Sequence, residues 1–423
     1  MAAPPAVTQP LSPDTPESGI VRLSIHKSLP WAAFYFFFNA AGLPLGLFYT
    51  SLLSPFLCIW LYTKGQRWIT TKFLLILSPF FVAHAYLGIQ SSLYYLRTLL
   101  LLWTVYIAAY GLCWALIKTR RIDRLFEELI ELNFLATLIA LVLFPTSIRS
   151  LLWMDDTTST RGASHLYRLN LLSIEPSAYA LLMLPLLLFS VLRLFGKQNA
   201  RNFLFLAMIG LPFLLCQSFG GLSMALAGIG IALLFSYKGV WRRPGPLIAF
   251  LALLALILLI CLTPNPVGNR VTQVVTGSDS STRSRTIFSY LAAYAVASSK
   301  NLWWGAGLGQ AKLFDFSALN TTIIDVIPNS AGSTIAEFGL IGLAAKITAE
   351  IYLFFKLKVH RNSFSLAMFV VVFITQLTGS FLTNVQEYVM WCFAFYSFFP
   401  NLDLHKAKIE HVEFVTQSRK AGC

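Results

Sequence analysis

The chain has 423 residues, of which 57% are hydrophobic and only 12% are charged, and its formal net charge is +14. A soluble domain cannot hide so much apolar surface, whereas apolar runs of about 20 residues fit membrane spans. The six cysteines show no C-x-x-C spacing, so the sequence indicates neither a zinc site nor a disulfide framework. The composition therefore predicts an all-α polytopic membrane protein with essentially one domain.

The chain begins with a proline-rich stretch. Residues 1–17 hold five prolines and no apolar core region, which predicts a disordered tail rather than a cleaved signal peptide. We expect a disordered cytoplasmic tail at 1–28, one transmembrane domain at 29–401 and a second cytoplasmic tail at 402–423. Apolar runs between charge clusters predict 12 spans, at 29–41, 43–63, 73–89, 92–117, 125–147, 174–195, 202–217, 220–237, 246–263, 331–355, 363–383 and 385–401. Gly42, Pro44 and Gly46 interrupt the opening pair, so 11 spans remain an alternative.

The Lys and Arg residues predict the orientation. With the N-terminus inside, every expected cytoplasmic loop carries basic residues, and the short outer hairpins near 88–91, 218–221 and 383–384 carry none. Two outer loops, at 145–173 and 264–330, are long, and long loops translocate regardless of their charge. Within the second loop, residues 287–298 are apolar at helical spacing, which predicts a helix along the membrane surface.

The first long loop leads to candidate catalytic residues. Arg161 and Arg168 precede Glu175-Pro176-Ser177 at the start of a span. Glu175 can orient or deprotonate a sugar hydroxyl as a general base. Alternatively, Pro176 starts the helix and the carboxylate complements the helix dipole. Arg161 and Arg168 are candidates for substrate contacts, and lipid phosphates are the alternative partners.

The second long loop contains Thr282-Arg283-Ser284-Arg285, directly before the expected surface helix. Guanidinium groups bind phosphate oxygens bidentately, so Arg283 and Arg285 are candidates for a pyrophosphate site, with a solvated charged turn as the alternative. The following Gly305-Ala-Gly307-Leu-Gly309 follows no strand. A sharp turn or close backbone packing is therefore favoured over a nucleotide site.

The tenth expected span adds polar candidates. Asn329 precedes it, and Glu337 lies in its apolar sequence, where a carboxylate is costly without a partner. Lys346 and Glu350 are spaced i, i+4 and are expected to neutralise each other as a structural pair. Ser218, in the turn Ser218-Phe-Gly220-Gly221, is a candidate sugar contact, although small residues there also permit close helix packing.

The order of these motifs resembles the O-antigen ligase/polymerase family of bacterial polysaccharide assembly. The resemblance covers roughly the second half of the chain and involves Arg168, Glu175-Pro176-Ser177, Ser218-x-Gly220-Gly221, Ser284-Arg285, Gly305/Gly307/Gly309, Asn329 and Glu337-x-Gly339-x-x-Gly342. It implies a GT-C-like fold and a metal-independent glycosyltransferase in the bacterial inner membrane, with its active site facing the periplasm. The implied partners are an undecaprenyl-pyrophosphate-linked oligosaccharide and membrane lipids, with a chain-length regulator protein as a candidate partner and no nucleic acid.

Polymerases of this family extend a lipid-linked repeat unit, whereas ligases transfer the finished glycan to lipid A-core. Ligases have a histidine directly before the asparagine, where this chain has Pro328, so the resemblance favours a polymerase. We expect Arg285, Arg168 and Arg283 to hold the pyrophosphate, with Glu175 as the first candidate base and His165 as the second. The outer loops contain no Asp/His/Glu cluster of metal-ligand spacing, so we expect neither a metal nor a cofactor.

A transporter or lipid flippase is the main competing prediction, because a dozen spans suit transporters. Transporters place buried charges near the bilayer midplane and often pair interrupted helices. Here the charges concentrate in the two outer loops, which favours chemistry at the interface. A receptor or scaffold would not need arginines beside a membrane-edge helix.

Overall fold

The computed structural model describes residues 42–43, 47–118, 122–155, 167–171, 173, 175–235, 255, 272–273, 276–278, 280–316, 327–380 and 382–402. This part of the chain is mostly helical, with two antiparallel pairs of short strands. The helical class predicted from composition is therefore confirmed. The predicted spans at 29–41 and 246–263 and the predicted tails lie outside the described residues, apart from Ala255 and Leu402.

The helices follow most of the predicted apolar runs. They are α2 (Tyr49–Thr63), α3 (Ile69–Leu87), α4 (Ser92–Lys118), α5 (Ile122–Val142), α6 (Arg149–Leu152), α7 (Pro176–Gly196), α8 (Ala200–Leu215), α9 (Phe219–Phe235), α13 (Ser280–Arg283), α14 (Ser289–Ser298), α15 (Ser330–Lys356), α16 (Ser363–Thr378) and α17 (Val385–Phe395). Within the described residues, the 4 helices α3, α4, α7 and α15 are long and apolar enough to cross a membrane, and α8, α9, α16 and most of α2 are shorter apolar helices. The count of 12 spans stays a prediction.

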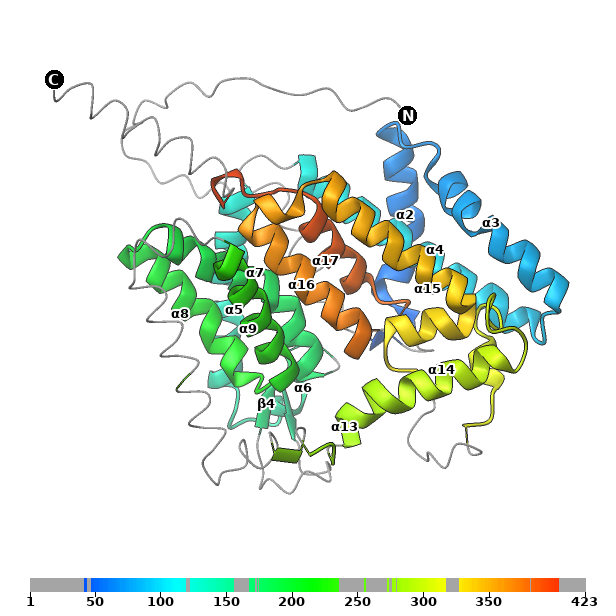
Figure 1. The fold of residues 1–423 in the computed structure, drawn as a ribbon. Coiled ribbons are helices and arrows are strands. Elements are labelled where there is room, and N and C mark those ends of the chain that lie inside the picture. Colours follow the sequence, from blue (N-terminus) through cyan, green and yellow to red (C-terminus); the bar gives the residue numbers. More distant parts are fainter. Residues whose placement is uncertain are drawn as a thin grey trace.

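Helix α7 lies at the centre of one side of the bundle. It is apolar on all faces, as expected of a helix surrounded by others, and packs against α5, α8, α9, α16 and α17 (Figure 1). Aromatic rings fill the same core, with the rings of Phe126, Phe189 and Phe364 each packed on Phe399. Helix α3, in contrast to the buried α7, exposes apolar residues: Ile76 and Val82 are 68% and 72% exposed. Such apolar surface fits contact with lipid.

Helix α15 is interrupted at Gly339, whereas the sequence predicted an unbroken span at 331–355. The backbone of Gly339 has φ 70° and ψ −170°, in a region that side chains disfavour. The break leaves backbone groups of α15 without partners inside the helix, and residues 303–306 form hydrogen bonds with them. Ala306 N–H donates to Ala336 O (2.8 Å), and Ile341 N–H donates to Trp303 O (3.1 Å). A Cβ atom on Gly339 would overlap the Trp303 carbonyl. The predicted close backbone packing at the glycine turn is therefore confirmed.

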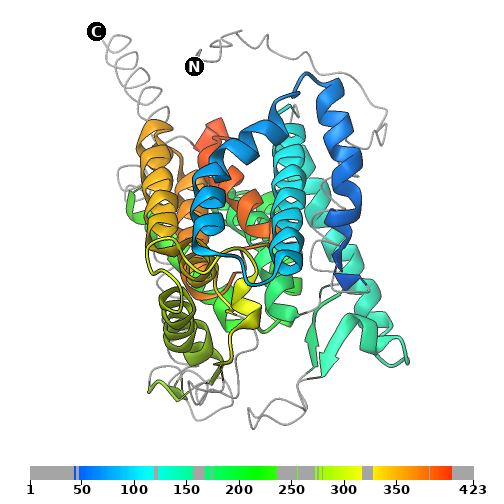
Figure 2. The ribbon, with the colours of Figure 1, turned by 90° about the vertical axis from the view of Figure 1, so that its right-hand side faces the viewer.

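A helical segment runs from Ser280 to Ser298 and includes the predicted surface helix. It comprises α13, a π-helical turn η3 (Ser284–Phe288) and α14. Helix α14 packs against α15. In Figure 2 it runs across the direction of α4 and the longer part of α15, and its placement along the membrane surface stays a prediction.

Described elements from both long loops lie at the same end of the bundle. In the first, β3 (Trp153–Asp155) pairs with β4 (Tyr167–Leu169), so that Met154 is opposite Arg168. Figure 1 shows β4, α6 and α13 together at the lower end. The other strand pair, β1 (Gly42–Leu43) with β2 (Leu47–Phe48), precedes α2. Residues separated by more than a hundred positions can thus meet at one end of the molecule.

Candidate functional site

Glu175 is held at the start of α7, where its carboxylate contacts side chains and caps no backbone N–H of the helix. It is the N-cap residue, in extended conformation, followed by Pro176 in the first turn. Its side chain accepts no hydrogen bond from the backbone of that turn. Instead, Oε2 accepts a hydrogen bond from the Ser177 hydroxyl (2.8 Å) and lies 3.8 Å from Nη2 of Arg285. The Glu175-Pro176-Ser177 sequence therefore starts the helix and leaves the Glu175 carboxylate available to Arg285 of the second long loop.

Arg285 reaches Glu175 from the π-helical turn of the second long loop. A π-helical turn displaces carbonyl groups from the regular hydrogen-bond ladder and is frequent at functional sites. The guanidinium lies against Gly379 at the end of α16, where a Cβ atom would be only 3.2 Å from Nη1. The side chains of Arg285 and Glu175 are 39% and 53% exposed, so both remain accessible to a ligand.

Asn329 connects the π-helical turn to the start of α15. Its Nδ2 donates a hydrogen bond to the Arg285 carbonyl (2.7 Å), while its Oδ1 accepts one from Gly332 N–H as the N-cap of α15. The residue is fully buried. Asn329 therefore positions Arg285 and is shielded from a substrate.

A second hydrogen bond connects the same helical segment to α16. The Tyr290 hydroxyl, two residues beyond the π-helical turn, donates to Leu377 O at the end of α16 (3.0 Å). Burial raises the pKa of this phenol. Both α15 and α16 thus hold the segment that carries Arg285, which limits the positions its guanidinium can adopt.

A polar network lies next to Asn329 in the interior. Lys346 Nζ donates to Glu387 Oε1 (2.6 Å) on α17 and to the Ser330 hydroxyl (2.9 Å), and that hydroxyl donates to the same carboxylate oxygen (3.1 Å). The expected partner, Glu350, instead accepts from Gln376 (2.8 Å). The predicted Lys346–Glu350 pairing is thus corrected to Lys346–Glu387. A basic residue in an apolar segment indicated a buried partner but not which one.

Other predicted site residues have different surroundings. Arg168 is buried and its Nε donates to Cys216 O (3.1 Å). The Ser218 hydroxyl is mostly buried and accepts from Gly221 N–H (3.2 Å), where a Cβ on that glycine would lie 3.0 Å from Ala180. These contacts give Arg168 and Ser218 structural roles at the loop ends of α8 and α9.

Two more of the predicted residues are described and two are not. The Arg283 guanidinium lies 5.0 Å from the centre of the Phe288 ring, in a cation–π arrangement. Glu337 lies at the break in α15, and its Oε2 is buried without a hydrogen-bond partner among the described residues. Its carbonyl accepts from Gly307 N–H (3.2 Å) in the glycine turn. Arg161 and His165 lie outside the described residues.

Sequence reasoning did not single out His84 as part of a site. Its Nε2 donates to Trp304 O (2.9 Å), so in the neutral ring Nδ1 accepts from the Tyr95 hydroxyl (3.1 Å). The imidazole is thereby used to fix the glycine turn against α3 and α4.

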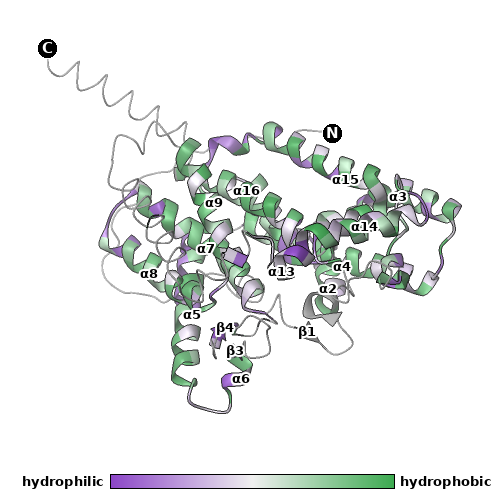
Figure 3. Cartoon of the chain, turned by 60° about the horizontal axis from the view of Figure 1, so that its bottom comes forward, coloured by the Kyte–Doolittle hydropathy of each residue, from purple (hydrophilic) through white to green (hydrophobic). Residues whose placement is uncertain are grey.

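The arrangement places one accessible guanidinium beside one accessible carboxylate. Figure 3 shows hydrophilic residues gathered at α13, among helices that are otherwise mostly hydrophobic. Such a pair can bind an anionic group through the arginine and accept a proton on the acid. Among the described residues, no group of three or more His, Cys, Asp or Glu side chains could hold a metal ion.

No protein-family model matches this sequence, and no curated protein is significantly similar to it.

Proposed function

We propose that this chain is a polysaccharide polymerase, a glycosyltransferase that moves a glycan from undecaprenyl pyrophosphate onto a lipid-linked repeat unit at the periplasmic face of the bacterial inner membrane. The observation that carries the proposal is the accessible Arg285–Glu175 pair, which joins the two long loops at one end of the bundle. The motif order that resembles the O-antigen ligase/polymerase family supports the same reaction.

In the proposed reaction, Arg285 binds the pyrophosphate of the donor. A phosphate oxygen competes with Glu175 for the guanidinium, and a pair separated by 3.8 Å at a partly exposed site is weak enough to be exchanged. The guanidinium then stabilises the negative charge that develops on the departing diphosphate. Asn329 and Gly379 act as positioning residues, because they fix the backbone and the space around this side chain.

Glu175 is proposed to accept the proton of the acceptor hydroxyl. The hydroxyl oxygen attacks the anomeric carbon, the bond from that carbon to the diphosphate oxygen breaks, and the diphosphate leaves with the electron pair. The displaced proton goes to the carboxylate, which Ser177 orients through its hydrogen bond. Because lipid diphosphate is a good leaving group, holding two large substrates in line supplies much of the rate.

Ligation to lipid A-core is the alternative within the same family. Ligases have a histidine where this chain has Pro328. Proline can neither accept nor donate a proton through its side chain, so the polymerase is favoured.

A transporter is the second candidate, and the interrupted helix α15 is the observation that favours it. Discontinuous helices bind substrates and ions in transporters through the backbone groups that the break frees. Here the glycine turn bonds those groups, with Ala306 N–H donating to Ala336 O and Leu340 N–H donating to Leu302 O (3.0 Å). The break is thus closed by the protein itself, which favours the enzyme.

The proposal is tested with purified protein in lipid and a synthetic undecaprenyl-pyrophosphate oligosaccharide as the only substrate, with products resolved on a gel. We expect a ladder of lengths that disappears in Arg285→Ala. Arg149→Ala is the matched control, because it removes the same charge from the first long loop, where the guanidinium lies over the Phe144 and Tyr167 rings. A full ladder from the Arg285 variant would refute the donor site. Product formation only after lipid A-core is added would establish the ligase.

A further inference from the structure

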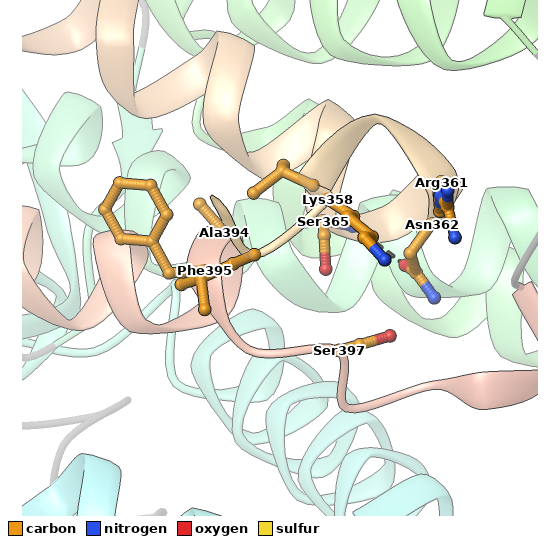
Figure 4. A pocket seen from close by; sticks show the side chains of 9 residues that line it. Lys358, Arg361, Asn362, Ser365, Ala394, Phe395 and Ser397 are labelled. Carbon is orange, nitrogen blue, oxygen red and sulfur yellow. Dashed lines mark hydrogen bonds between the residues drawn. The ribbon is translucent and has the colours of Figure 1, made fainter. Parts of the chain in front are cut away.

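A separate cavity, lined by both polar and apolar residues, lies at the turn between α15 and α16. It has a volume of about 220 Å³ and is lined by Leu357, Lys358, Val359, Arg361, Asn362, Ser365, Ala394, Phe395 and Ser397 (Figure 4). This is smaller than the roughly 300–1,000 Å³ of pockets that hold drug-sized ligands, so it suits a single small group. Helix α16 separates it from Arg285, which contacts Gly379 at the helix's other end, about 24 Å away for 16 residues at about 1.5 Å per residue.

The charge at this cavity is positive. Two of its lining residues, Lys358 and Arg361, are basic, and none of the described residues that line it is acidic. Lys358 has a left-handed backbone (φ 55°), which turns the chain between α15 and the 3-10 turn η6 (Val359–Arg361). Arg361 Nε is buried without a hydrogen-bond partner in this described part of the chain. A buried donor of this kind is costly unless a ligand satisfies it.

The start of α16 adds to the positive potential. Asn362 caps the helix by accepting from Ser365 N–H (3.0 Å), and its Nδ2 donates to Phe399 O (2.8 Å). The N-terminus of a helix attracts anions through its dipole and its backbone N–H groups. Within the first turn, Ser365 is only 2% exposed and lines the cavity, yet its hydroxyl has no hydrogen-bond partner among the described residues. Figure 4 shows this hydroxyl directed into the space next to Ser397.

We propose that this cavity binds the phosphate of an anionic ligand, at the end opposite the proposed active site. Arg361 and Lys358 neutralise the phosphate, and the Ser365 hydroxyl donates a hydrogen bond to one of its oxygens. The Lys/Arg distribution assigns this end to the cytoplasm, where both anionic lipid headgroups and soluble phosphate compounds are available. The experiment distinguishes these two sources.

The test uses full-length protein in nanodiscs. Inorganic phosphate is titrated in phosphatidylcholine nanodiscs at constant ionic strength, and phosphatidylglycerol is introduced at increasing fractions in a second series. The thermal unfolding midpoint reports binding, because a ligand of the folded state raises it. A rise with phosphate assigns a soluble compound, and a rise only with phosphatidylglycerol assigns a lipid headgroup; either result supports the site.

Three variants locate the binding. Arg361→Ala and Ser365→Ala each remove a donor to a charged group, so affinity is expected to fall about tenfold. Ser365→Asp is sharper, because an acid in the first turn favours the helix and repels the anion, so the fold persists while binding is lost. Lys356→Ala is the matched control, since this lysine lies over the Tyr352 ring outside the cavity. Midpoint shifts in Ser365→Asp equal to those of the wild type, or no shift with either probe in the wild type, would overturn the proposal.

Discussion

Asn329 offers a way to test whether Arg285 depends on the buried residue beneath it. The Asn329 amide has two separable functions, because Oδ1 caps α15 and Nδ2 donates to the Arg285 carbonyl. Asn329→Asp keeps an oxygen that can cap the helix but replaces the donor with an oxygen. Two oxygens then face each other at a buried position. Asn329→Ala removes both functions.

The magnitudes follow from these two contacts. Leaving a buried carbonyl without its donor costs about 1–3 kcal/mol, so Asn329→Asp is expected to lose roughly that much stability. Asn329→Ala loses in addition the cap, which contributes about 0.5–2 kcal/mol. Displacement of Arg285 by even about 1 Å is expected to lower activity on the order of 100-fold in either variant.

The assay combines thermal unfolding of the purified protein with the product ladder. Asn362→Asp is the matched control. Asn362 likewise caps a helix through Oδ1 and donates through Nδ2 to a carbonyl, that of Phe399, but it lies at the end of α16 far from Arg285. This variant should cost similar stability and leave the product ladder unchanged. Adding Asn329→Asp to Arg285→Ala should lower activity little further, because Asn329 acts on the reaction through Arg285.

Either of two results would refute this reasoning. The first is full activity in Asn329→Asp despite the expected loss of stability. The second is an equal loss of activity in Asn362→Asp, which would attribute the effect to stability rather than to the position of Arg285.

Three further variants test the fold and the site. Gly339→Ala should destabilise the protein by at least about 3 kcal/mol, since the new Cβ overlaps the Trp303 carbonyl and the backbone is left-handed; an unchanged unfolding midpoint would contradict the broken helix. Lys346→Met should cost about 3–5 kcal/mol, because it leaves the buried Glu387 carboxylate without its cation, and adding Glu387→Gln should recover much of the unfolding midpoint. Gly379→Leu should abolish the product ladder with little change in stability, because the side chain displaces the guanidinium; a full ladder would show that its position is unimportant.

Much of the secondary structure could be predicted from the sequence. Apolar runs bounded by charges gave α4 and α7 to within two residues of their observed ends, because the length of such runs is set by the need to satisfy every backbone group in an apolar environment. The helix at 287–298 and the tight turn at the glycines were likewise readable, since they depend on local periodicity and on backbone conformations that favour glycine.

The interruption of α15 was not predicted. A hydropathy window detects apolar composition, and residues 331–355 remain apolar across the break. Gly339 needs its left-handed conformation because Trp303 and Gly305 pack on it, and this contact is visible only when both glycine motifs are placed together in space.

The partners of the polar residues also depended on tertiary structure. Local spacing favoured Lys346 with Glu350, whereas helix packing brings Glu387 of α17 within 2.6 Å of Lys346. The sequence predicted Arg285 and Glu175 as candidate site residues. Their contact could not be predicted, because local sequence patterns carry no information on which side chains of two different loops lie close together.

The sequence by itself therefore determined the helical class and most of the apolar helices, and it predicted candidate site residues in the two long loops. That result depends on composition and local pattern. Only the tertiary structure decided that Arg285 meets Glu175, that Asn329 is buried beneath them and that a basic cavity lies at the opposite end of α16. The physical reason is that packing between helices, rather than the order of residues, sets which side chains come within hydrogen-bonding distance.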